Sequence, residues 1–140
     1  MSRATPEMRD FAECLVAYEM RGAKPSGAKT PAAFHVCEML RPHLAGLMGK
    51  AGFSALLARA LALAVAEVPE LRAVQVREDG SMAGWDAPEA VAEPEKLAEG
   101  GVVLVAQLLG LLDAFIGQNL TLRIMREVWP KLSLSELFFK

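Results

Sequence analysis

The stretch that decides the fold is residues 53–68, FSALLARALALAVAEV. Only Ser54, Arg59 and Glu67 interrupt its apolar side chains. A helix that is apolar on nearly every side is typical of a buried element. Pro69 follows directly, and a proline does not continue a helix. We therefore expect residues 53–68 to form a buried helix at the centre of a mainly α-helical domain.

A second apolar stretch, Val102 to Ile116, predicts the partner of this helix. Gln107 and Asp113 interrupt it, and it is shorter than the roughly 20 residues that cross a membrane. We interpret it as part of a core helix from about Glu99 to Ile116. Both predicted helices repeat small residues at every fourth position, which lets two backbones approach closely. The two helices are therefore predicted to pair along a seam of Ala58, Ala62 and Ala66 against Ala106, Gly110 and Ala114.

Each of these two helices carries a lone charge near its middle. The charges are Arg59 and Asp113. Because a buried charge needs a partner, we predict a buried polar pair between them with a structural role. The alternative is that the two side chains line a pocket.

Helix signals also flank this central pair. Thr5-Pro6 predicts the start of a first helix, which ends near Gly22. Thr30-Pro31 predicts the start of a second, which is expected to bend at Pro42 or to break there into two. The pattern from Leu120 to Trp129 predicts one more helix before the C-terminal tail.

Residues 71–77 change to an alternating pattern, and Asp79-Gly80 is a strong hairpin signal. The predicted fold is therefore mainly α, a bundle of about five helices with a small β-hairpin insert between the third and fourth helices. We expect one helical domain over 1–140, with the hairpin and an acidic loop at 71–98 and a C-terminal tail at 131–140.

Composition restricts the class of protein. The chain has 140 residues, is 53% hydrophobic and carries a net charge of −2. These values argue against a disordered chain and make nucleic acid an unlikely partner. Two cysteines do not make a disulfide framework, and the first residues lack a signal-peptide pattern. We therefore expect a cytoplasmic protein that does not enter a membrane.

Few residues point to chemistry. No nucleophile elbow, phosphate loop or dinucleotide fingerprint occurs in the sequence. His35, Cys37, Glu38 and His43 are the densest reactive cluster, but Cys37 projects away from His35 on a helix. We therefore expect no metal, no cofactor and no catalytic residue.

The expected function is a small cytoplasmic interaction or regulatory module without catalytic activity, which self-associates or docks on a larger partner. Aromatic and apolar residues outside the predicted core are the candidate anchors. A second interpretation stays open, a small-ligand or metal-binding protein, with or without catalysis, whose site lies near His35, Glu38 and His43 or near Arg59 and Asp113. The candidate interaction residues are Trp85, Trp129, Leu134, Leu137, Phe138 and Phe139.

Overall fold

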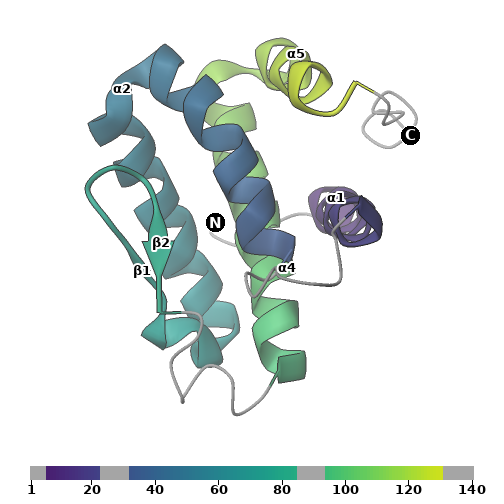
Figure 1. Cartoon of the computed structure of the whole chain (residues 1–140), viewed down its shortest axis with the longest axis vertical. Helices are drawn as coiled ribbons and strands as arrows, with labels where there is room; N and C mark the ends of the chain where they lie inside the picture. The colour runs from purple at the N-terminus through teal and green to yellow at the C-terminus, as the bar shows by residue number, and fades with distance from the viewer. Residues whose placement is uncertain (1–5, 23–31, 85–93, 131–140) are drawn as a thin grey trace.

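The computed structural model describes residues 6–22, 32–84 and 94–130. Within them the chain forms four helices and one short hairpin (Figure 1). The predicted mainly helical class is confirmed, and the hairpin lies close to its predicted place. The elements are α1 (Pro6–Gly22), α2 (Ala32–Glu67), the 3-10 turn η1 (Pro69–Ala73), β1 (Gln75–Val76), β2 (Met82–Ala83), α4 (Pro94–Ile116) and α5 (Gln118–Val128).

The prediction of about five helices is wrong, because the second and third predicted helices are joined in α2. The chain stays helical through Pro42, whose ring is exposed, and changes direction at Gly49 instead. Gly49 has φ 83° and ψ 158°, a conformation that a residue without a Cβ adopts most readily. Figure 1 shows the two arms of α2, residues 32–48 and 50–67, running in opposite directions from this bend.

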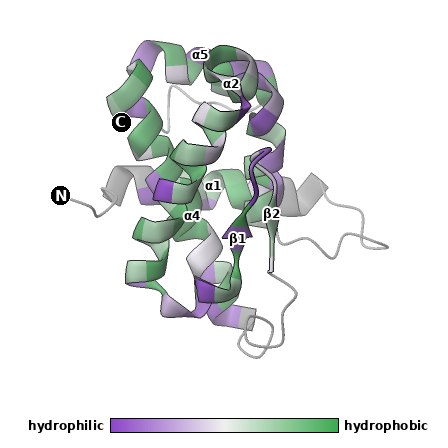
Figure 2. Cartoon of the chain, turned by 90° about the vertical axis from the view of Figure 1, so that its left-hand side faces the viewer, coloured by the Kyte–Doolittle hydropathy of each residue, from purple (hydrophilic) through white to green (hydrophobic). Residues whose placement is uncertain are grey.

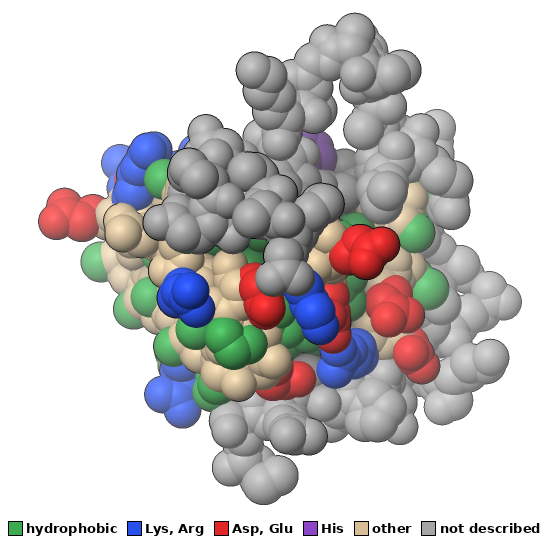
Figure 3. Space-filling view, turned by 90° about the horizontal axis from the view of Figure 1, so that it is seen from below, with side chains coloured by type: hydrophobic (Ala, Val, Ile, Leu, Met, Phe, Trp, Pro, Cys, Tyr) green, Lys and Arg blue, Asp and Glu red, His purple; other side chains and the backbone are tan. Residues whose placement is uncertain are grey.

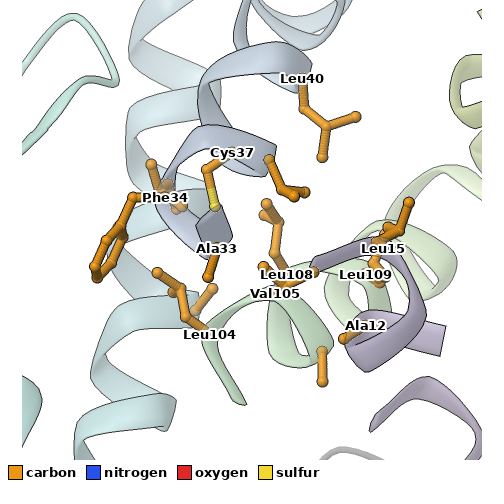
Figure 4. Packing of buried hydrophobic residues seen from close by; sticks show 14 of the residues in the cluster. Ala12, Leu15, Ala33, Phe34, Cys37, Leu40, Leu104, Val105, Leu108 and Leu109 are labelled. Atoms are coloured by element: carbon orange, nitrogen blue, oxygen red, sulfur yellow. The ribbon is translucent and has the colours of Figure 1, made fainter. Parts of the chain in front are cut away.

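The core is centred on α4, in which every side chain from Val103 to Leu109 is buried. Gln107 is the one polar side chain in this run and is only 4% exposed. Figure 4 shows how α1 and the first arm of α2 contribute to the same core. The residues that meet there are Ala12 and Leu15 of α1, Ala33, Cys37 and Leu40 of α2, and Leu104, Val105, Leu108 and Leu109 of α4.

The predicted seam of small residues does not form the contact between α2 and α4. Ala58, Ala62 and Ala66 are all exposed, so this part of the prediction is wrong. The buried face of the second arm carries larger side chains, including Leu57 and Leu61. The helix faces with the larger apolar side chains pack together, because buried apolar area stabilises the fold. An alanine methyl group contributes little buried area.

The glycine pair Gly100-Gly101 leaves no room for side chains on this part of α4. A Cβ atom on Gly101 would lie 2.6 Å from the Cβ of Ala33 in the first arm of α2. A Cβ atom on Gly100 would lie 2.6 Å from Cγ of Leu71 in η1. These two glycines therefore allow tight packing of α4 against α2 and η1.

The hairpin is shorter than predicted, because Leu71 to Ala73 form η1 rather than strand. Val76 pairs with Met82 in the antiparallel ladder, and Gln75 pairs with Ala83. Figure 2 shows that the turn is hydrophilic while the helices behind it are largely hydrophobic. A hairpin of two residues per strand needs support from neighbouring elements.

That support comes from both arms of α2. Arg41 of the first arm lies 3.6 Å from the Asp79 carboxylate, measured from Nη1 to Oδ2. Ser54 of the second arm donates a hydrogen bond of 2.7 Å to the carbonyl of Arg77. The turn therefore links the two arms close to the bend between them.

Candidate functional site: an apolar groove between α2 and α4

Most of the predicted interaction residues lie outside the described part of the chain. These are Trp85, Leu134, Leu137, Phe138 and Phe139. Trp129 is described, and it is only 2% exposed at the end of α5. Because its ring fills the core, Trp129 does not offer an anchor on the surface, and that prediction is corrected.

The predicted buried pair of Arg59 and Asp113 is also wrong. Arg59 is exposed on the second arm of α2, and Asp113 is half-buried on α4. Arg59 faces Leu111 and Phe115 of α4. Asp113 is two residues from each of these, or about 200° around the helix, so it points to the opposite side. Its Oδ1 atom is buried and has no hydrogen-bond partner among the described residues.

The histidine cluster does not converge either. Glu38 lies 3.2 Å from Nη2 of Arg41, and Nδ1 of His43 lies 3.5 Å from the carboxylate of Glu127 on α5. His35 is exposed on the first arm. Across residues 6–22, 32–84 and 94–130, no three His, Cys, Asp or Glu side chains lie together as metal ligands. The metal-binding interpretation therefore gains no support from this cluster.

Cys37 is buried in the core, and burial raises the pKa of its thiol to about 12, with a smaller contribution from the charge of Glu38. The thiol is therefore protonated at neutral pH. A protonated, buried thiol is a poor nucleophile and a poor metal ligand.

The feature that sequence reasoning missed is an apolar groove between the second arm of α2 and the end of α4. Its volume is about 510 Å³. Phe115 is 69% exposed at its edge, and Leu47, beside the groove residue Met48 in the chain, is 48% exposed. The groove is lined by Met48, Gly52, Ala55, Leu56, Arg59, Leu111, Ala114 and Phe115.

The sequence makes this groove with small residues. Gly52 and Ala55 line it on α2, and Ala114 lines it on α4. Their side chains are too small to fill the space between the two helices, so a hollow remains. Phe115 lies seven residues beyond the buried Leu108, on the same side of α4. Leu108 is fully buried, whereas the ring of Phe115, one residue before the end of α4, is exposed.

A shallower hollow of about 400 Å³ lies on the other flank of the same arm. Ala58 and Ala62 line this second hollow, and both are exposed. Arg72 is the one charged residue lining the second hollow, as Arg59 is in the groove. The two hollows beside the second arm are thus mainly apolar, and the described lining of each contains one cation.

Several charged residues elsewhere form ion pairs. At the lower end of the molecule Arg9 lies 3.6 Å from Glu67 and 3.8 Å from Glu99. Gln107 donates a hydrogen bond of 3.0 Å to Glu67. Figure 3 views this end and shows acidic and basic side chains beside one another. This network ties α1, α2 and α4 together, and we assign it a structural role.

Comparison with protein-family models, with curated proteins and with solved structures finds no match to this chain. Its function is therefore inferred from the chemistry of its own surface.

Two described helices, Ala33–Glu67 and Glu95–Ile116, are long and apolar enough to cross a membrane by length and composition alone. This is weak evidence, because the core helix of a soluble protein passes the same test. The most apolar window is 56% buried in α4 but only 28% buried in α2. A larger share of the apolar window is therefore exposed in α2 than in α4.

Proposed function

We propose that the chain is a small protein–protein interaction module without catalytic activity, which receives an apolar helix of a protein partner in the groove between α2 and α4. The observation that carries this proposal is the 69% exposure of Phe115 at the edge of the groove. Burial of a phenylalanine side chain contributes about 1.5–3 kcal/mol, so a partner that covers Phe115 gains that free energy. Helix-in-groove docking is a common mode of peptide recognition.

A cytoplasmic location belongs to the same proposal. It is supported by two free cysteines, Cys14 and Cys37, since thiols are kept reduced in that compartment. The exposed surface suits a protein better than a lipid bilayer. Leu47 and Phe115 are the two large exposed hydrophobic residues of the described chain. The other exposed apolar side chains on the second arm of α2 belong to alanines, which gain little from insertion.

A small apolar molecule in the same groove is the second candidate. The volume of about 510 Å³ lies within the usual range of ligand sites. Such sites usually enclose most of the ligand surface, whereas Phe115 is mostly exposed here. The exposed ring therefore favours a partner helix over a small ligand.

The test is a titration of the full chain with a fluorescent helical peptide that carries leucines on one face and glutamines on the other. The Phe115→Gln variant should lose binding and keep its melting temperature, because an exposed side chain adds little to stability. Ala98→Gln, at an exposed position of the same helix, is the matched control and should bind as the wild type does.

Equal binding by the wild type and Phe115→Gln would overturn the proposal. Native mass spectrometry of the purified chain distinguishes the second candidate. A small bound mass that is present in the wild type and absent in Phe115→Gln would favour a ligand site over a protein partner.

A further inference from the structure

We infer that the partner helix is acidic: it carries carboxylates beside its apolar stripe, and one of them pairs with Arg59. This inference rests on the proposed function and adds the chemical class of the partner. It starts from the single charged side chain among the described residues that line the groove.

Arg59 is placed to receive an anion. It is exposed beside Ala55 and Leu56, and no acidic side chain of the described residues forms an ion pair with it. The other described residues that line the groove are uncharged. A helix docked there would cover part of the guanidinium, and a covered guanidinium needs a partner such as a carboxylate, which it binds through two parallel hydrogen bonds.

Two other exposed cations lie near the ends of the same arm of α2, outside the described lining of the groove. Lys50 is exposed at its start, and Arg72 lines the second hollow beyond its end. Neither forms an ion pair within the described ranges. The nearest carboxylate of the arm, Glu67, is engaged by Arg9 and Gln107. The charge offered to a helix docked in the groove is therefore that of Arg59, although the whole chain carries a net charge of −2.

The same charges disfavour a second copy of the chain as the occupant. Arg59 lies at the middle of the second arm, residues 50–67. A twofold contact centred on the middle of this arm brings the Arg59 side chains of the two copies to the same level. Like charges brought together across an interface oppose association, whereas an acidic helix meets no such barrier.

The experiment uses two designed helical peptides with the same leucine face, one flanked by glutamates and one by lysines. Their affinities for the full chain are measured by fluorescence anisotropy at about 0.15 M salt. The wild type should bind the glutamate peptide about tenfold more tightly than the lysine peptide. Arg59→Glu should reverse this order. Arg123→Glu, an exposed position on α5, is the matched charge control and should leave the order unchanged.

The outcomes separate this inference from the proposed function. If both peptides bind equally and Phe115→Gln abolishes both, the groove is a helix site and the acidic partner is overturned. If neither peptide binds, the helix-docking function falls as well.

Two further measurements overturn the acidic helix in favour of another occupant. The first is a dimer in sedimentation that Phe115→Gln dissociates. The second is binding to vesicles of phosphatidylcholine and phosphatidylglycerol that competes with the glutamate peptide.

Discussion

The turn of the hairpin rests on the ring of Phe53: a Cβ atom on Gly80 would lie 2.6 Å from Cδ2 of that ring. Gly80 also has φ 88°, which side-chain-bearing residues rarely adopt. Phe53 is fully buried in the second arm of α2, a few residues after the bend at Gly49. The contact therefore fixes the hairpin where the two arms of α2 diverge.

Gly80→Ala should lower the free energy of unfolding by about 2–4 kcal/mol, because the new methyl group overlaps Phe53 and the backbone is strained. Gly46→Ala is the control, at a helical glycine whose Cβ would meet no atom within 4 Å. It should raise stability by about 0.5–1 kcal/mol. Urea unfolding of both variants measures the difference, and equal effects would contradict the contact.

The carboxyl of Asp79 is held ionised by the turn. Hydrogen bonds from the hydroxyl and the backbone N–H of Ser81 lower the pKa of Asp79 from 3.8, and the charge of Arg41 adds to them. Since the folded-state pKa is the lower one, the stabilisation is present above the unfolded-state pKa and is lost as pH falls through the folded-state value. Ser81→Ala should raise the pKa of Asp79 in an NMR titration. An unchanged midpoint would contradict this origin.

Gly101→Ala should destabilise the chain by about 1–3 kcal/mol, since its methyl would overlap that of Ala33. Gly110→Ala is the control on the same helix, because a Cβ there meets nothing within 4 Å. It should be neutral or stabilising by up to about 1 kcal/mol. Thermal unfolding that shows Gly110→Ala to be the more damaging change would contradict the observed packing of α4.

Cys37 should resist alkylation in the folded chain. Burial both excludes the reagent and keeps the thiol protonated, with a pKa of about 12. Its modification near pH 8, followed by mass spectrometry, should therefore track global unfolding in urea. Rapid labelling of Cys37 in the native chain would show that the α2–α4 core opens locally.

Local patterns predicted much of the fold. The Asp79-Gly80 turn forms as expected, and α1 begins at Pro6 and ends at Gly22. The bend expected at Pro42 does not form, because Pro42 faces solvent and the helix tolerates its ring. The chain turns instead at Gly49, which has a positive φ and lies between the second and third predicted helices.

The groove could not be predicted from sequence patterns, because long-range packing decides which apolar residues are covered. Leu108 and Phe115 share one side of α4, so periodicity assigns both to the core. Whether each is covered depends on where the second arm of α2 runs, and that is set by long-range packing. Composition does not distinguish a buried helix face from an exposed one either, because alanines are compatible with both a tight seam and an exposed face.

The most direct test of the groove is a map of amide chemical shifts on adding the glutamate-flanked peptide to the full chain. Helix docking in the groove predicts changes concentrated in residues 48–59 of α2 and 111–115 of α4, with little change in α1. Shifts that centre instead on α1, or that are absent at saturating peptide, would contradict the assignment of this groove as the docking site.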